Sequence, residues 1–512
     1  MGDERPPSHA RRMWLRFSVA GVLIVALAGG ATATVALNTA SSIAHELFKN
    51  PVEAPKGLIA PYTGGAQTYL VLGSDRRAKS ADVYDRSDPP HSDTILLIRF
   101  DPGQGQTSVL SIPRDLLVNI KSRSGAYYPQ EKVNAAYTYG AREGGAKGSM
   151  VLAAETIEHE VFPGLKLNGI VDVNFGGFIK VVDTLGCVYV NVDHRYLHVN
   201  GEGAELYSEI NLQPGYQKLC YNNALSYVRY RHGDSDFVRV ARQQDFVRAM
   251  REQISPEDVL GQIEHVANEV GKAIVTAGFE TSADQVIQLA KLIGFSQGKP
   301  LRQVKFRATS ANYALRGGSY VTSTPELERA TLDDFLYGHQ NVTEARPRAP
   351  SAHGGQRHAH GASTPSAASL ALTSSSSSGN AELAKATVGM PLQVLYPSLQ
   401  TVSSTEQPAR AYDLRDKGGV LRHAYIAVWQ ENTLGGYYDF EGTDWPNPPL
   451  IAHPNQQRKI NGVTYLVFTD GAHIHVIAWR QGGMLYWLTN TLLEDLSNEQ
   501  MLAIARSAKP LH

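Results

Sequence analysis

The stretch "TILLIRFDPGQGQTSVLSIPRD", from Thr94 to Asp115, contains two short apolar runs, and each run ends in charged residues. The runs Thr94–Phe100 and Thr107–Ile112 are typical of buried strands, and "TYLVLG", Thr68–Gly73, is a third such run before them. Helical candidates follow at Ser149–Glu160, Phe175–Leu185, Asp236–Glu252 and Ser282–Ile293. Because strands and helices are interspersed, we predict an α/β fold: a central mixed β-sheet flanked by helices in three layers, α/β/α.

Charged residues stand at the ends of these predicted strands. If the three runs pair as an antiparallel meander, the end of the first, the start of the second and the end of the third lie along one edge. Asp75, Asp93 and Arg114 occupy those places. Carboxylate oxygens beside a phosphate favour Mg²⁺, with Mn²⁺ as the alternative, so Asp75 and Asp93 are the predicted metal ligands.

A second charged stretch, "RYRHGDSDFVRVARQQ", runs from Arg229 to Gln244. On a strand, Arg229 and Arg231 would point to the same face about 6.5 Å apart, a spacing that suits two phosphate groups. A helix that starts at Ser235 or Asp236 would put Asp236, Arg239 and Gln243 on one side. A solvated ion-pair network is the alternative for such a run. Carboxylates at the strand ends favour a pyrophosphate site.

The N-terminus predicts the compartment. Phe17–Leu37 contains no charged residue and follows several arginines, which predicts a transmembrane helix with a cytoplasmic N-terminus and an extracytoplasmic remainder. A cleaved signal peptide is the alternative. In an exported chain Cys187 and Cys220 are expected to form a disulfide. The chain has 512 residues and a formal net charge of -1, which argues against nucleic-acid binding.

Composition divides the chain into six predicted segments. These are a cytoplasmic tail (1–16), an anchor (17–39), a tether (40–66), a catalytic domain (67–340), a disordered linker rich in Ser, Ala and His (341–383) and an accessory α+β domain (384–512). His353, His358 and His360 lie in the linker, where a disordered tract gives no fixed geometry for a metal.

The last segment contains strand-like runs and one helical pattern. The runs are Arg422–Gln430, Val463–Asp470 and His473–Arg480, and the helix is Leu496–Ala508 with Ser497 as its cap. For His473 and His475, packing or surface placement is favoured over a metal site. Four tryptophans, Trp429, Trp445, Trp479 and Trp487, could form a sugar-binding platform, although core packing is the default. We predict a binding or positioning domain.

The motifs "LGSDRR", "HSDTILLI", "SIPRDLLV", "KVNAAYTYG", "VDVNFGGFIKVVDTLGCVYV" and "ALSYVRYRHGDSDFVRVARQQ" resemble, in order and spacing, the LytR–CpsA–Psr (LCP) family of bacterial cell-envelope proteins. The resemblance implies a membrane-anchored, Mg²⁺-dependent phosphotransferase with an LCP-like sheet and an apolar cleft for a prenyl chain. Such an enzyme transfers a glycopolymer from a polyprenyl-pyrophosphate carrier to peptidoglycan and forms a phosphodiester.

The resemblance also implies roles for individual residues. Asp75 and Asp93 would hold Mg²⁺, and Arg114, Arg229 and Arg231 would grip the pyrophosphate. Asp236, Arg239, Gln243 and Lys132 match further motif positions. His91 stands where many members have an arginine, so Arg76, Arg77 and Arg86 are candidates to supply that charge, and Asp234 is a rival to Asp236.

The chemistry of phosphoryl transfer depends on positioning and charge neutralisation. The predicted catalytic residues are Asp75, Arg114, Arg229, Arg231 and Asp236, and the predicted lipid-diphosphate contacts are Arg77, His91, Lys132, Arg239 and Gln243. Asp75 is also a candidate base for the acceptor hydroxyl. A polyprenyl-pyrophosphate phosphatase and a non-catalytic envelope regulator or binding protein are the alternative functions.

Overall fold

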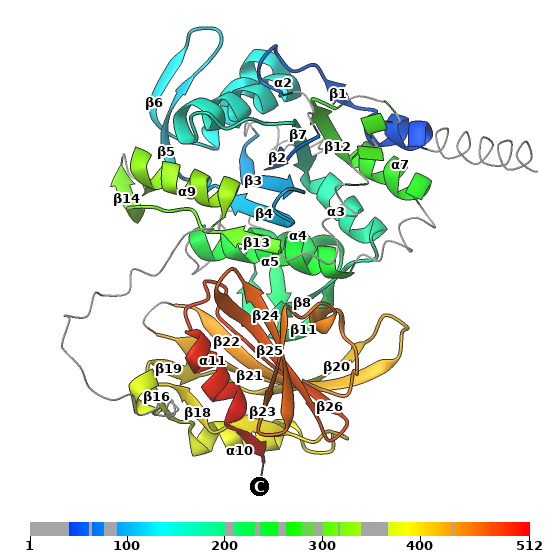
Figure 1. The fold of residues 1–512 in the computed structure, drawn as a ribbon, viewed down its shortest axis with the longest axis vertical. Helices are drawn as coiled ribbons and strands as arrows, with labels where there is room; N and C mark the ends of the chain where they lie inside the picture. Colours follow the sequence, from blue (N-terminus) through cyan, green and yellow to red (C-terminus); the bar gives the residue numbers. More distant parts are fainter. Residues whose placement is uncertain are drawn as a thin grey trace, which may run out of the picture.

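The computed structural model describes residues 40–60, 64–75, 90–199, 209–230, 236–253, 263–279, 301–315, 318–338, 367–432 and 435–511, with a few single positions between 282 and 291. The chain forms two domains, the first coloured blue to green and the second yellow to red in Figure 1. The predicted anchor and the linker histidines lie outside the described residues, as do Arg76, Arg77, Arg86, Arg231 and Asp234. In the part that is described, no helix is both long and apolar enough to cross a membrane.

A seven-stranded mixed sheet forms the centre of the first domain. Its order is β1 (Pro51–Val52), β12 (Ile274–Ala277), β7 (Gly169–Asn174), β2 (Gln67–Ser74), β3 (Ser92–Asp101), β4 (Gln106–Ser111) and β13 (Leu301–Val304). The predicted meander is confirmed, because β2, β3 and β4 pair antiparallel in that order. The pairs β2–β7 and β4–β13 are parallel, which makes the sheet mixed.

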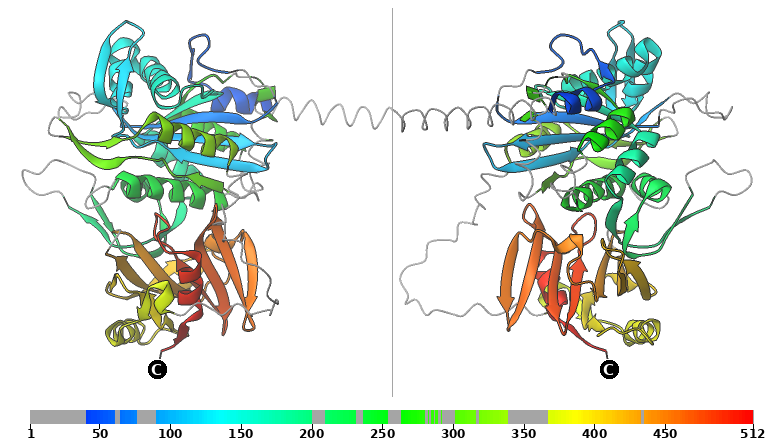
Figure 2. Two further views of the ribbon diagram at one scale, coloured as in Figure 1. Left: turned by 60° about the vertical axis from the view of Figure 1, so that its left-hand side comes forward. Right: turned by 90° about the vertical axis from the view of Figure 1, so that its right-hand side faces the viewer.

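Helices cover both faces of this sheet (Figures 1 and 2). Leu70, Leu97 and Leu110 pack on one face with α2 (Ala135–Thr156) and α9 (Pro325–Tyr337). Leu96 and Val109 point to the other face, where Val247 of α5 (Asp236–Gln253) packs against them. Since side chains alternate along a strand, burial on both faces requires a helical layer on each side. The three-layer prediction is therefore confirmed.

The remaining elements of the first domain surround this core. The helices are the π-helical turn Ile157–Val161, α3 (Phe175–Thr184), α4 (Tyr221–Arg229) and α7 (Ile263–Ala273). The strand pairs are β5 (Leu117–Lys121) with β6 (Tyr127–Lys132), β8 (Val188–Val192) with β11 (Gly215–Leu219), β9 (Tyr196–His198) with β10 (Ile210–Leu212), and β14 (Ser310–Leu315) with β15 (Gly318–Thr322).

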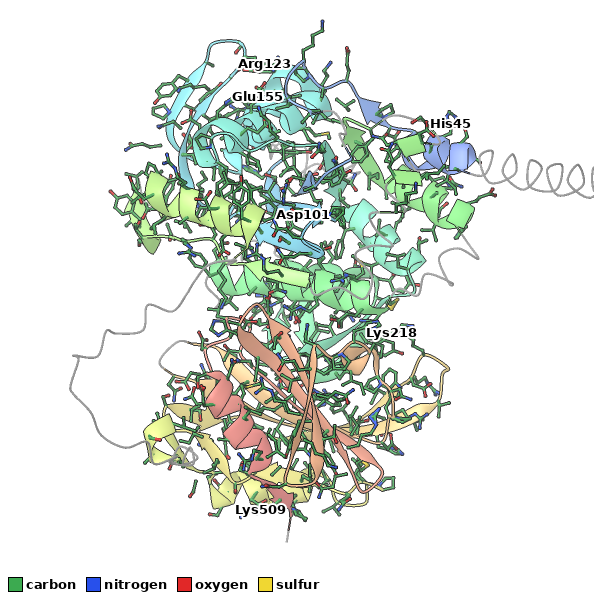
Figure 3. All side chains as sticks on the ribbon, in the orientation of Figure 1. His45, Asp101, Arg123, Glu155, Lys218 and Lys509 are labelled. Carbon is green, nitrogen blue, oxygen red and sulfur yellow. A yellow bond between two sulfur atoms is a disulfide. The ribbon has the colours of Figure 1, made fainter. Side chains whose placement is uncertain are left out.

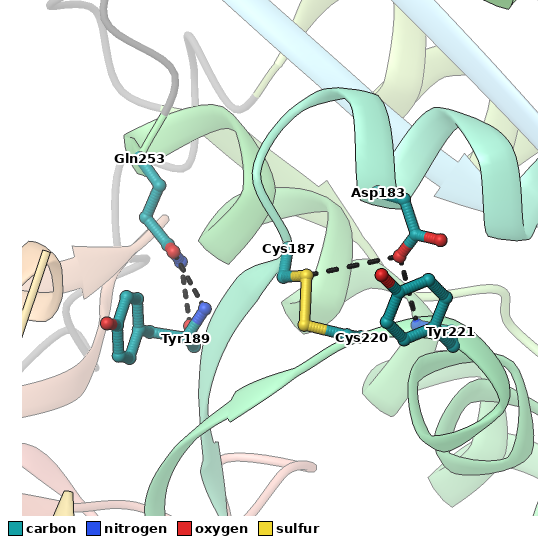
Figure 4. Close-up of a disulfide and its surroundings, with 6 residues drawn as sticks. All are labelled: Asp183, Cys187, Tyr189, Cys220, Tyr221 and Gln253. Atoms are coloured by element: carbon teal, nitrogen blue, oxygen red, sulfur yellow. Dashed lines mark hydrogen bonds between the residues drawn. A yellow bond between two sulfur atoms is a disulfide. The ribbon is translucent and has the colours of Figure 1, made fainter. Parts of the chain in front are cut away.

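A disulfide closes the base of the β8–β11 ribbon (Figure 4). Cys187 precedes β8 and Cys220 follows β11, and their Cα atoms are 4.9 Å apart. The antiparallel register, in which Val188 faces Leu219, brings the two cysteines together. The predicted disulfide is therefore present.

Residues 40–66 differ from the predicted tether. Residues 40–47 are helical, and Ala40, Ala44 and Phe48 repeat at helical spacing and are buried. The ring of Phe48 stacks on Phe279 at 4.8 Å between centroids. Strand β1 then extends the main sheet, so this segment belongs to the folded domain.

The second domain is built on one antiparallel sheet. The strand order is β19 (Ser404–Glu406), β21 (Leu421–Glu431), β22 (Tyr437–Thr443), β26 (Met484–Thr489), β25 (His473–Gln481), β24 (Val463–Asp470) and β23 (Gln456–Ile460), and β20 (Arg410–Arg415) pairs with β21. Helix α11 (Asn498–Arg506) packs on one face and has Ser497 as its cap, as predicted. The three predicted strands lie in β21, β24 and β25.

The folded part of this domain starts earlier than residue 384. Residues 367–386 contain β16 (Leu372–Ser374) and α10 (Ser377–Ala386), and β16 pairs with β18 (Leu399–Thr401). Leu372 and Leu383 are buried in the core of the domain. The predicted linker, 341–383, therefore overlaps a folded segment that begins by residue 367.

The two domains share a hydrophobic cluster at their junction. Tyr189 of β8 and Tyr216 of β11 pack against Trp445 and Trp487 of the second domain. Figure 3 draws the side chains at this junction, where Lys218 of β11 is labelled. All four candidate tryptophans are at most 5% exposed, so the sugar-platform alternative is wrong and core packing is confirmed.

Candidate phosphate-binding site

The edge of the main sheet brings the predicted strand-end residues together. Arg114, just after β4, forms an ion pair and a hydrogen bond with Asp93 near the start of β3. At the end of β2, the backbone N–H of His91 donates to Asp75 Oδ1 at 2.6 Å, and the N–H of Asp75 donates back to the His91 carbonyl at 3.1 Å. The antiparallel meander produces this arrangement, as the sequence predicts.

Two further arginines converge on Asp93. The Arg229 Nη2 atom lies 3.9 Å from Asp93 Oδ2. Burial alone would raise the pKa of Asp93, but Arg114, Arg239 and Arg229 together lower it below its ordinary value. Two guanidinium groups therefore lie close to Asp93, and a third, Arg239, acts on it electrostatically.

Arg229 is not on a strand, which corrects the prediction for "RYR". It is the last residue of α4 (Tyr221–Arg229). In this helix Ala224, Tyr227 and Val228, at positions i, i+3 and i+4, are buried. These apolar residues follow the helical period and pack with α3 and α5, so the local segment forms a helix. The guanidinium of Arg229 lies 3.9 Å from the centre of the Phe175 ring, a cation–π contact that orients it.

Helix α5 contributes the buried side of the site. It begins at Asp236 among the described residues, and Asp236 pairs with Arg239 at 2.5 Å. Gln243, one turn further, donates from Nε2 to the Val228 carbonyl at 3.1 Å and so holds the end of α4. The predicted face of Asp236, Arg239 and Gln243 is buried, with exposures of 3–7%.

Lys132 reaches the site through a residue that the sequence analysis missed. Its Nζ atom lies 2.8 Å from Asp115 Oδ1, and Asp115 also lies 3.8 Å from the Nε atom of Arg114. Burial lowers the pKa of Arg114, but Asp93, Asp115 and Asp236 outweigh burial and raise it. Asp115 follows Arg114 directly in "SIPRD", and that adjacency was the available signal. Phe175 was also missed, although it lies in the motif "VDVNFGGFIKVVDTLGCVYV" and begins a predicted helix.

The donor set fits a divalent cation that is shared with a phosphate ligand. Asp75 and Asp93 stand near the ends of adjacent antiparallel strands. Mg²⁺ is commonly held by one or two carboxylates together with substrate phosphates. Among the described residues no group of three or more His, Cys, Asp or Glu side chains has a metal-binding arrangement. A divalent cation held by Asp75 and Asp93 stays a prediction.

Several charged groups of the site remain accessible to a ligand. The side chains of Arg114, Arg229 and Lys132 are 21%, 30% and 29% exposed. Guanidinium groups bind phosphate through parallel N–H donors. The site thus presents partly exposed cationic groups that can contact a phosphate ligand.

The fold and the site define a three-layer α/β domain with a cluster of cationic groups at one sheet edge. Comparison with known proteins identifies the family. The family model described as "LytR_cpsA_psr family" matches residues 32–331. The chain belongs to this family, as its motifs predicted.

The chain is similar to several curated proteins over its first domain. It is 30% identical to the polyisoprenyl-teichoic acid–peptidoglycan teichoic acid transferase TagT of Bacillus subtilis, over 48% of this chain and 72% of TagT. It is 28% identical to the probable cell wall biosynthesis protein LcpB of Corynebacterium glutamicum, over 52% of this chain and 60% of that protein. The chain spans only half the length of an uncharacterized protein of Staphylococcus aureus, at 28% identity.

Solved structures resemble the same part of the chain. The crystal structure of B. subtilis TagV is 22% identical and covers 54% of this chain and 98% of its own, with a TM-score of 0.41. A LytR-Csp2A-Psr enzyme from Actinomyces oris is 16% identical and covers 55% of this chain, with a TM-score of 0.40.

Proposed function

We propose that the protein transfers a glycopolymer from a polyprenyl-pyrophosphate carrier to peptidoglycan in cell-wall assembly. The observation that carries the proposal is the convergence of Arg114, Arg229 and Arg239 on Asp93 at one open edge of the sheet. The printed names of its relatives support the substrate class, because TagT and its counterparts act between polyisoprenyl-linked teichoic acid and peptidoglycan.

The reaction is an exchange at one phosphorus atom. An acceptor hydroxyl of peptidoglycan attacks the phosphorus that bears the glycopolymer, and the bond from this phosphorus to the bridging oxygen breaks. The products are a phosphodiester between glycopolymer and peptidoglycan, and polyprenyl monophosphate. The hydroxyl proton passes to a base, and we assign this role to Asp75 through a carboxylate oxygen that is not bound to the metal.

The arginines supply charge stabilisation. Arg114 and Arg229 would bind the non-bridging and leaving oxygens, whose negative charge grows as the bond to the bridging oxygen breaks. Lys132 would hold the diphosphate from the β6 side, and the buried Arg239 would add positive charge to the site from the α5 side. Mg²⁺, bound by Asp75 and Asp93, would neutralise further charge on the phosphate oxygens.

The proposed location follows from the substrate. A polyprenyl carrier is confined to a membrane and peptidoglycan lies outside it. We therefore propose that residues 17–39 form a single-pass anchor in the cell membrane, with the N-terminus cytoplasmic and both domains extracytoplasmic. This arrangement would place the arginine site near the lipid.

The test uses the full chain in detergent with a polyprenyl-pyrophosphate-linked saccharide, soluble peptidoglycan fragments and MgCl₂. Arg114→Ala and Arg229→Ala should each lower formation of the phosphodiester product by about 100-fold or more. Arg329→Ala, on the exposed side of α9, is the matched control and should keep full turnover. Unchanged turnover in both site variants would refute the assignment. Phosphate release without a phosphodiester product would indicate a phosphatase instead.

A further inference from the structure

A second polar site lies between the two domains, away from the sheet edge. It is a cavity of about 460 Å³, within the range of roughly 300–1,000 Å³ that small-molecule sites occupy. Asp245, Arg248 and Glu252 of α5 line one side, and His475 of β25 and the segment around Ala452 line the other. The motifs discussed above do not include any of these residues.

The charged walls of the cavity are fixed by pairs across the domain junction. His475 Nε2 lies 3.2 Å from Asp245 Oδ1, and Arg248 Nη2 lies 2.9 Å from Asp470 Oδ2. Burial raises the pKa of Asp245, but the hydrogen bond and charge of His475 outweigh burial, and the pKa is lowered. Because these side chains are held by partners, the cavity is preformed.

The charge balance favours an uncharged ligand. Arg248 already faces Asp470 and Asp245, so its charge is matched by carboxylates and it is poorly suited to bind an anion. No metal-binding group of three or more acidic, His or Cys side chains occurs in the described parts of the chain, which disfavours a bare cation. Burial raises the pKa of Glu252 to about 7, so near neutral pH this carboxyl both donates and accepts hydrogen bonds.

The other walls combine amide groups with aromatic rings. Asn191 and Asn455 supply amide groups, and the rings of Tyr189, Tyr216 and Phe468, at most 8% exposed, close the cavity toward the core. A sugar complements the amides and the Glu252 carboxyl, because its edge carries hydroxyls that donate and accept. Ala452, His453 and Asn455 are exposed, so the cavity can be reached from solvent.

Helix α5 connects this cavity to the phosphate-binding site. Arg239 and Arg248 are nine residues apart, which is about 14 Å along the helix axis. At about 100° per residue, Asp245, Arg248 and Glu252 lie on the side opposite to Asp236, Arg239 and Gln243. A glycan substrate that is bound at its phosphate has further sugar units about this far from the reacting phosphorus.

We propose that the interdomain cavity is a saccharide subsite that binds a sugar unit of the acceptor strand or of the donor polymer. The subsite rests on the proposed function for its role, but its binding chemistry does not require turnover. It would raise the residence time of the polymer substrate while the diphosphate occupies the arginines.

Isothermal titration calorimetry with two tetrasaccharides tests whether the bound sugar comes from the acceptor strand or from the donor polymer. The full chain in detergent is used. Chitotetraose, made of N-acetylhexosamine, represents the acceptor strand, and maltotetraose, made of hexose, represents a hexose polymer donor. We expect saturable binding of at least one of them, and the tighter ligand indicates the source. Absence of binding by both would overturn the proposal.

Variants locate the binding site. Ala452→Trp places an indole in the exposed wall of the cavity and should weaken tetrasaccharide binding at least 10-fold. Ala384→Trp, on the exposed surface of α10, is the matched control and should bind within twofold of the unmodified chain.

Glu252→Leu removes a partly buried acid while keeping volume and should weaken binding at least fivefold, with folding checked by thermal melting. Undiminished binding by both cavity variants would overturn the proposal. Because binding is read without turnover, loss of the proposed transferase activity would not produce this result.

Discussion

The two sides of helix α5 carry similar residues but face different surroundings. Asp236, Arg239 and Gln243 face the sheet edge of the first domain, where Arg239 acts on Asp93. On the opposite side, Asp245 and Arg248 meet residues of the second domain. Helix α5 has no long apolar side. It is nevertheless largely buried, because the charged residues on both of its polar sides have partners.

The difference between the sides lies in the groups that they contact, because Arg239 of α5, at 3% exposed, is closed off from solvent as well. At the sheet edge, Arg229 keeps 30% of its side-chain surface exposed, so a ligand can reach it. At the junction, Arg248 is 11% exposed and its partner Asp470 is 3% exposed. The α5 side at the sheet edge therefore supports an accessible arginine on a neighbouring helix, whereas the α5 side at the junction holds two domains together. The same chemistry thus serves binding on one side and docking on the other.

The largest effect is expected from a change on the catalytic side. Arg239→Met removes a buried guanidinium that acts on Asp93, so turnover should fall about 100- to 1000-fold, the usual cost of losing one charge-stabilising donor. Turnover is measured as phosphodiester product at a temperature at which thermal melting shows the variant folded. Equal turnover with and without Arg239 would remove the functional distinction between the two sides.

The same substitution on the docking side should affect stability instead. Arg248→Met leaves Asp470 and Asp245 buried without their arginine, which should cost about 3–5 kcal/mol of unfolding free energy. Denaturant unfolding measures this loss, with Arg329→Met as the surface control. Turnover per folded molecule should change little, and a 100-fold loss of turnover would contradict docking as the main role of Arg248.

The ribbon that carries the junction depends on its disulfide. Replacing Cys187 and Cys220 together by serine opens a loop with a sequence separation of 33 residues. The unfolding free energy should fall by about 2–4 kcal/mol, because the unfolded chain gains conformational freedom. Thermal melting with and without reductant checks this, and the serine variant should be insensitive to reductant. A reductant effect that persists would contradict the assignment.

The smallest free-energy change per experimental step is expected when pH is varied by one unit. Burial raises the pKa of Glu441 to about 8 and also raises the pKa of Asp439, and both lie at the junction against Tyr216 and Asn191. A carboxyl with a raised folded-state pKa holds its proton more tightly when folded. The contribution of Glu441 to the unfolding free energy should therefore be fully present below about pH 4.5. It should fall as pH rises toward 8, by at most about 1.4 kcal/mol per pH unit.

Glu441→Gln tests this dependence, since an amide does not titrate. The slope of unfolding free energy against pH between 5 and 8 should become shallower in the variant. Glu264→Gln, on the exposed surface of α7, should leave the slope unchanged. Parallel slopes for all three proteins would show that Glu441 does not titrate in this range.

Local pattern was enough to predict the strands and the edge where the site forms. Asp75, Asp93 and Arg114 could be placed because an antiparallel meander brings the ends of β2 and β4 beside the start of β3. Ser497 was predicted as a cap because serine precedes a helical pattern there, and in the structure its side chain accepts a hydrogen bond from the Gln500 N–H. These features depend on contacts that are close in sequence or repeat with a fixed period.

Tertiary structure decided the rest. The spacing of Arg229 and Arg231 is compatible with a strand, but packing of Tyr227 and Val228 against α5 places Arg229 in a helix. Asp115 and Phe175 act on the site only through contacts made across the fold. The docking of the second domain could not be predicted either, because Asp245 and His475 are far apart in sequence. A linear pattern records which side chains are polar, whereas the partner of a buried charge is set by the long-range packing that brings the two together.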